Sequence, residues 1–190
     1  MTASHLLAQN LGFLGVVLAV LVWAKHRLGA AAPFPGPRPV GPAFKTWLIV
    51  IWLVGMVLPL VALVYDGIIR AEPKALLAII PYIVMFVGQV VVEIICWKRF
   101  GSPIWVLVPT LFLPWRLFQI YLGLSLIGGP ETLPLTYWTL IALFILWTIN
   151  IGVHFSNIPR HMRWDLHPLD AKFDHLSQPN VFAKPKEPNP

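Results

Sequence analysis

The chain has 190 residues, of which 57% are apolar and 12% are charged, with 14 basic and 8 acidic side chains. Globular domains average roughly 45–50% apolar and about 25% charged residues, so the composition excludes an ordinary water-soluble domain as well as a disordered or collagen-like chain. The single cysteine excludes a disulfide-stapled fold. A membrane-spanning helix needs about 20 apolar residues, and the apolar residues here are enough for about five such helices.

Long, continuously apolar segments predict the positions of these helices. In chain order they cover about residues 6–24, 46–65, 75–97, 103–127 and 135–154. Their hydrophobicity shows no period of two, which argues against transmembrane β-strands. The sequence therefore predicts an all-α integral membrane protein, with a bundle of five transmembrane helices over residues 1–154.

The distribution of Lys and Arg predicts the orientation of the bundle. Five alternating spans leave only Arg70 and Lys74 on one side of the membrane. Eleven basic residues fall on the other side: Lys25, Arg27, Arg38, Lys45, Lys98, Arg99, Arg160, Arg163, Lys172, Lys184 and Lys186. Cytoplasmic loops are enriched in Lys and Arg, so we expect the N-terminus outside and the C-terminus in the cytoplasm.

Two segments outside the spans differ in composition. Residues 29–44 are rich in proline, which disfavours helix, and we expect them to form a cytoplasmic linker. Residues 155–190 are polar and too few for a domain, so we expect a short cytoplasmic tail that is loose from about residue 181.

Two charged residues, Glu93 and Arg116, fall inside the predicted spans. A charge at the bilayer centre costs about 2.5–3.5 kcal/mol on insertion scales, so it usually has a partner or faces a cavity. Residues seven, four or three positions apart share a face of a helix. Such faces would form one polar pocket if they converge, and this candidate ligand site comprises Tyr82, Gln89, Glu93, Arg116, Gln119, Asn150 and His154.

The same polar residues have simpler explanations. Hydrogen bonds between membrane helices contribute roughly 0.6–2 kcal/mol each and hold bundles together without any ligand. His154 is a candidate ligand for haem iron or chlorophyll magnesium, but its position near the end of a span favours a hydrated side chain. The acids and histidines of the tail lack the close pairs of a metal site, so we expect no metal.

No common catalytic or nucleotide-binding motif occurs in the sequence. Ala8, Gly12, Gly15 and Ala19 form a small-residue stripe on the first predicted helix, which suits close packing against another helix. We therefore expect a noncatalytic subunit or assembly factor of a larger membrane complex, with or without a lipophilic cofactor such as a pigment, quinone or sterol-like molecule. The expected partners are the lipid bilayer and other membrane subunits, not nucleic acid.

An alternative class of function is a small membrane enzyme or carrier for a lipophilic substrate. In that case Glu93 would transfer a proton and Arg116 would hold an anionic group. Both classes predict a multi-pass membrane protein, in either the plasma membrane or an internal, thylakoid-type membrane.

Overall fold

The structure is a computed structural model that describes residues 3–28, 42–100 and 107–163. Every element in these ranges is helical, and no β-strand occurs in them. In chain order the elements are α1 (Ala3–Leu28), α2 (Pro42–Trp52), the π-helical η1 (Leu53–Val57), α3 (Leu58–Ala62), the π-helical η2 (Leu63–Ile69), α4 (Pro73–Phe100), α5 (Leu107–Ile127) and α6 (Pro134–Arg163).

Five stretches of helix are long and apolar enough to span a membrane. They are Ser4–His26, Lys45–Ile69, Pro73–Cys96, Leu107–Ile127 and Pro134–Phe155, the second being formed by α2, η1, α3 and η2 together. The predicted all-helical fold with five such helices is thereby confirmed.

The last helix is longer than its predicted span. The backbone of α6 continues past residue 154 to Arg163, so the first part of the predicted tail is helical. Between Gly152 and Arg163 no glycine interrupts this helix. Pro159 lies within it and does not end it. The predicted linker, apart from its last residues, and the tail from residue 164 onward lie outside the described residues.

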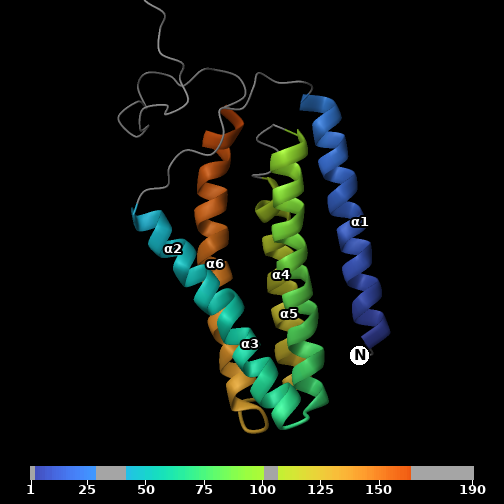
Figure 1. The fold of residues 1–190 in the computed structure, drawn as a ribbon, viewed down its shortest axis with the longest axis vertical. Coiled ribbons are helices and arrows are strands. Elements are labelled where there is room, and N and C mark those ends of the chain that lie inside the picture. Colours follow the sequence, from blue (N-terminus) through green and yellow to red (C-terminus); the bar gives the residue numbers. More distant parts are fainter. Residues whose placement is uncertain (1–2, 29–41, 101–106, 164–190) are drawn as a thin grey trace, which may run out of the picture.

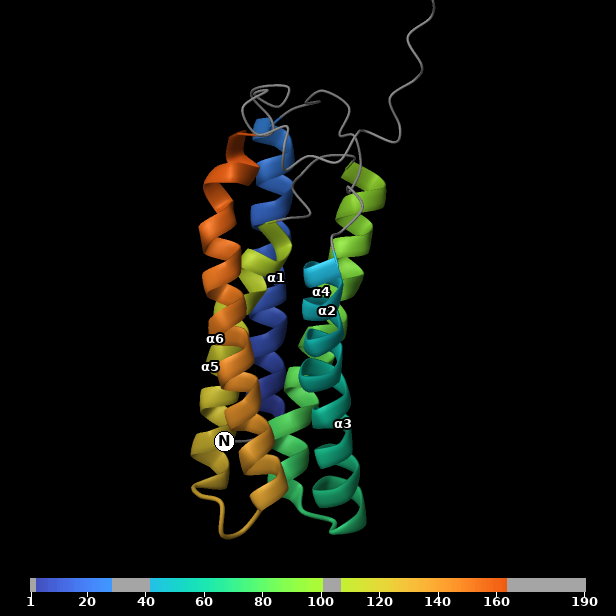
Figure 2. The same ribbon diagram turned by 90° about the vertical axis from the view of Figure 1, so that its left-hand side faces the viewer.

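The helices run alternately up and down along one long axis (Figure 1). Helices α4, α5 and α6 pack side by side, the α2–η2 segment lies against α4 and α6, and α1 lies against α4 and α5 (Figures 1 and 2). The end of α1, the start of α2 and the end of α4 point toward the same end of the bundle (Figure 1). Lys25, Lys45 and Lys98 belong to these three helix ends.

The interior contains two apolar clusters. The larger joins α3, α4, α5 and α6 and includes the fully buried Leu113, Leu140 and Leu143. The smaller joins α1 to α4 and α5 through Val17, Leu21 and residues such as Phe112. Close packing at the helix crossings depends on small residues, as is usual in membrane bundles.

Gly123 shows how tight one of these crossings is. A Cβ atom at this position would lie 3.2 Å from Leu140 Cδ1 and 3.4 Å from Ala78 Cβ. A methyl group at residue 123 would therefore require Leu140 on α6 to shift slightly, while it would make an ordinary contact with Ala78 on α4.

Candidate functional site

Arg116 lies in the middle of the bundle, and its side chain is 1% exposed. Its guanidinium carbon is 4.4 Å from the centre of the Phe86 ring and 4.2 Å from the Trp147 ring. Helices α4 and α6 therefore supply an aromatic cage for a cation on α5. Its Nε atom makes no hydrogen bond within the described part of the chain.

Tyr82 holds the cage in place from α4. Its hydroxyl donates a hydrogen bond to the Gly55 carbonyl at 2.7 Å and accepts one from Trp147 Nε1 at 3.0 Å. Pro59 has no N–H, so the Gly55 carbonyl four residues earlier lacks its usual helical donor, and Tyr82 supplies one instead. Gly55 also leaves room for the Trp147 ring, because a Cβ there would lie 3.1 Å from Trp147 Cζ2 and the ring would have to shift.

Glu93 and Gln89 are neighbours on α4. The Gln89 side-chain amide donates a hydrogen bond of 2.5 Å to Glu93 Oε1, while Gln89 Oε1 is buried without a partner. Glu93 and Arg116 form no direct ion pair: the ion pair found in the described residues joins Arg70 and Asp66. That the two charges face one shared pocket stays a prediction.

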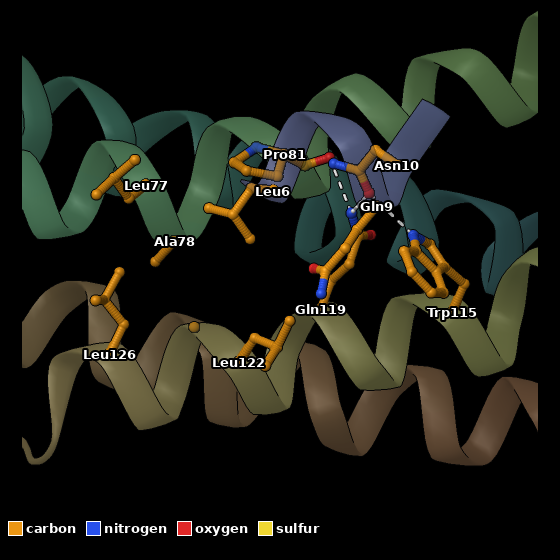
Figure 3. A pocket seen from close by; sticks show the side chains of 11 residues that line it. Leu6, Gln9, Asn10, Leu77, Ala78, Pro81, Trp115, Gln119, Leu122 and Leu126 are labelled. Carbon is orange, nitrogen blue, oxygen red and sulfur yellow. Dashed lines mark hydrogen bonds between the residues drawn. The ribbon is translucent and has the colours of Figure 1, made fainter. Parts of the chain in front are cut away.

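Gln119 faces a different part of the bundle, between α4, α5 and α1 (Figure 3). Its Nε2 donates hydrogen bonds to Asn10 Oδ1 at 2.9 Å and to the Pro81 carbonyl at 3.2 Å. Asn10 Oδ1 also accepts a bond from Trp115 Nε1 at 3.0 Å, and the Phe13 and Trp115 rings stack 4.5 Å apart. Asn10 is therefore the polar anchor of α1.

Asn150 forms a separate contact on α6. Its side-chain oxygen accepts a hydrogen bond of 3.1 Å from Trp47 Nε1, which ties α6 to α2. His154, one turn further on, is partly buried. The predicted site residues thus divide into groups: the Arg116 cage with Tyr82, the Gln89–Glu93 pair, Gln119 with Asn10, and Asn150 with Trp47. Their action as one ligand site stays a prediction.

A buried acid that the sequence reasoning did not select lies at the opposite end of the bundle from Lys25. Asp66 is 0% exposed and accepts hydrogen bonds from the Thr136 backbone N–H at 3.0 Å and from its hydroxyl at 2.6 Å. Arg70 donates a third bond to it at 3.1 Å. Because Thr136 lies in the first turn of α6, Asp66 caps that helix and joins it to η2.

Buried atoms without partners indicate where a ligand or water would bind. Among the described residues these are Gln89 Oε1, Arg116 Nε, Gln119 Oε1 and Thr139 Oγ1. Three of the four belong to residues selected from the sequence. In the described ranges, no group of three or more His, Cys, Asp or Glu side chains is placed to hold a metal ion.

The sequence contained a signal for Asn10, which the initial selection missed. Asn10 and the neighbouring Gln9 are the two polar side chains within the otherwise apolar first span. Asp66 was harder to select, because it is close to the predicted end of the second span, where an acid is commonly exposed.

Comparison with known proteins gives one match. A family model with the description "Domain of unknown function (DUF7733)" matches residues 15–126. The match runs from the middle of α1 to the end of α5 and includes Arg116 and Gln119, whereas Asn150 and His154 lie beyond it. No curated protein and no solved structure matches the chain.

Proposed function

The chain belongs to the DUF7733 family, whose description assigns no activity, and we propose that it is a noncatalytic subunit or assembly factor of a larger membrane complex. We further propose that its five helices cross the membrane, with the N-terminus outside and the C-terminus in the cytoplasm. The length and hydropathy of the five helices support the crossing. Clustering of Lys25, Lys45 and Lys98 at one end supports the orientation.

The observation that carries the proposed role is the outer face of α1. Ala8, Gly12, Gly15 and Ala19 are all exposed, and a Cβ atom built at Gly12 or at Gly15 would meet nothing within 4 Å. The residues that hold α1 to the bundle, such as Asn10, Val17 and Leu21, lie on the opposite face of this helix. A small-residue face that its own chain leaves uncovered fits close packing against a helix of another subunit.

Two features support a noncatalytic role. Most of the buried polar side chains bond to one another across helices, as Asn150 does to Trp47 and Asp66 does to Thr136. The two connections that the structure describes outside the helices, residues 70–72 and 128–133, are each too short to hold an active site.

A second candidate function, an enzyme or carrier using Glu93 and Arg116, is favoured by one observation. Arg116 is buried, and its Nε has no hydrogen-bond acceptor among the described residues. An anionic group on a lipophilic substrate would supply that acceptor.

The two candidates differ in the size of the particle they predict. We expect the tagged chain, extracted from its native membrane in a mild detergent, to elute in a particle several times heavier than its own 21.4 kDa. A self-sufficient particle of one or two chains would contradict the subunit proposal and favour the second candidate.

Variants of α1 locate the contact within the complex. Gly12→Leu should reduce the heavy particle to free chain, because a leucine would prevent close helix packing. Gly152→Leu on the exposed face of α6 is the matched control, since a Cβ at Gly152 also meets nothing within 4 Å. Equal effects of the two variants would contradict a specific role for the α1 face.

A further inference from the structure

A hollow between α1, α4 and α5 combines an apolar part with a polar end (Figure 3). Leu6, Leu77, Leu122 and Leu126 line the apolar part, and Asn10 and Gln119 are at the polar end. The residues that line it are all uncharged. The hollow is therefore suited to an amphiphile without a net charge on its head group.

The polar end contains an acceptor that lacks a donor. Both hydrogens of the Gln119 amide are used, because Nε2 donates to Asn10 Oδ1 and to the Pro81 carbonyl. A flipped amide would place its oxygen against these two acceptors, so the orientation is fixed. Gln119 Oε1 consequently remains a buried acceptor with no partner in the described residues, and leaving such a group unpaired costs about 1–3 kcal/mol.

Asn10 does not relieve this deficit: its side-chain nitrogen makes no hydrogen bond to Gln119 Oε1, and its oxygen is itself an acceptor. Its Oδ1 already accepts hydrogen bonds from Trp115 Nε1 and from Gln119 Nε2. The missing partner of Gln119 Oε1 must be a donor from outside this network. A hydroxyl group meets the requirement, whereas a carboxylate or phosphate would bring only further acceptors.

The size of the hollow limits the head group. Its cavity volume is about 10 Å³, which is about the space that one water or one hydroxyl group occupies. A ring system therefore does not fit the enclosed part, but a hydroxyl does, with a hydrocarbon chain lying in the open part.

We propose that this hollow binds the hydroxyl end of a neutral, long-chain aliphatic alcohol from the membrane. The hydroxyl donates to Gln119 Oε1, and the chain lies along Leu77, Leu122 and Leu126 between α4 and α5. Fatty alcohols, isoprenoid alcohols and glycerides all present this chemistry. The site is independent of the proposed assembly with other subunits.

Photolabelling of the full chain in phosphatidylcholine vesicles tests the site. The probe is hexadecanol with a diazirine in its chain, and the comparison probe is its methyl ether, which cannot donate a hydrogen bond. We expect the alcohol to label peptides containing Leu77 or Leu122 about fivefold more than the ether does, the effect of one net hydrogen bond. An excess of unlabelled hexadecanol should remove this labelling, while farnesol and a diacylglycerol, added separately, should show which class of alcohol competes best.

Two tryptophan variants locate the probe within the structure. Leu6→Trp fills the hollow and should reduce labelling of these peptides at least fivefold. Leu7→Trp is the matched control, because Leu7 is 59% exposed and does not line the hollow. Both variants should first be shown to elute and to melt like the natural chain, and Leu122→Trp replaces Leu6→Trp if the latter does not fold.

Several results would overturn the proposal. Equal labelling by the alcohol and the ether would show that no donor is recognised. Labelling that survives the filling variant, or that spreads evenly over the exposed helix faces, would show that the hollow is not the site.

Discussion

Arg116 illustrates how a single residue is accommodated inside an apolar bundle. Placing a charge at the centre of a membrane helix costs about 2.5–3.5 kcal/mol, and a desolvated cation–π contact contributes about 2 kcal/mol or more. Two such contacts, with Phe86 and Trp147, are of the same size as the insertion cost. The aromatic cage therefore accounts for the buried cation without requiring contact with Glu93.

A double-mutant cycle separates the cage from the acid. Trp147→Leu and Arg116→Leu should be coupled by about 1–2 kcal/mol in the free energy of unfolding, because they remove the same contact. Glu93→Gln and Arg116→Leu should be additive within about 0.5 kcal/mol. Equilibrium unfolding in detergent micelles measures both values, and a larger coupling for the Glu93 pair would support the predicted joint pocket instead.

Tyr82 offers a test of a single hydroxyl group. Tyr82→Phe should lower the free energy of unfolding by about 1–3 kcal/mol, since it removes the acceptor of Trp147 Nε1 and a donor to Gly55. Tyr121→Phe is the matched control, because Tyr121 on α5 is 62% exposed. Removing its hydroxyl should change the free energy of unfolding little. Similar effects of both variants would show that the buried hydrogen bonds contribute nothing specific.

Asp66 should show a graded response to substitution. Asp66→Ala leaves the Thr136 N–H and hydroxyl without an acceptor and should cost about 3 kcal/mol of unfolding free energy. Asp66→Asn keeps one acceptor oxygen and should cost less, whereas Glu131→Ala, at an exposed acid in the same end loop, should be neutral. Thermal unfolding in detergent ranks the three variants, and an equal loss for alanine and asparagine would contradict a capping role.

At the scale of elements, the helices follow from hydropathy, because only helices and closed β-barrels satisfy the backbone inside a bilayer and the apolar segments lack the period of two that barrel strands show. The sequence therefore predicts the number and approximate position of the apolar helices. The π-helical segments η1 and η2 are not predictable in this way. In η1, for example, the Gly55 carbonyl accepts a hydrogen bond from Tyr82 on another helix, a contact that the local sequence does not reveal.

The candidate site was only partly predictable for a related reason. Spacing along one helix shows which residues share a face, and it brought Gln89 together with Glu93. Spacing does not show how each helix is rotated against its neighbours. This rotation directs Gln119 toward Asn10 on α1 and places Arg116 between Phe86 and Trp147, and so divides the residues that the sequence grouped.

Helix α1 is the element most dependent on a few contacts. Asn10→Leu should loosen it from α4 and α5, because Trp115 Nε1 and Gln119 Nε2 lose a shared acceptor at a cost of about 1–3 kcal/mol. Hydrogen exchange should then rise in α1 more than in α6. Ser125→Ala is the control, since the Ser125 hydroxyl bonds only within its own helix, and unchanged exchange in α1 would contradict the anchoring role of Asn10.

For the whole molecule, the proposed insertion explains features that a water-soluble bundle would not share. Many large apolar side chains are exposed on the outer faces of the helices, including Leu11, Val61, Val84 and Ile145. In water such surfaces would aggregate, whereas in a bilayer they contact lipid. In the proposed orientation the end that contains Lys45 and Lys98 faces the cytoplasm, in keeping with the enrichment of Lys and Arg in cytoplasmic loops.

Cysteine labelling tests the five crossings and their orientation most directly. The chain has one cysteine, the buried Cys96, so Cys96→Ala provides a background for single cysteines at the exposed residues Lys45, Lys74, Lys98 and Thr132. We predict that a membrane-impermeant maleimide added to intact cells labels residues 74 and 132, and reaches residues 45 and 98 only after the membrane is permeabilised. Labelling of residue 45 or 98 in intact cells, or equal labelling at all four positions, would contradict the proposed topology.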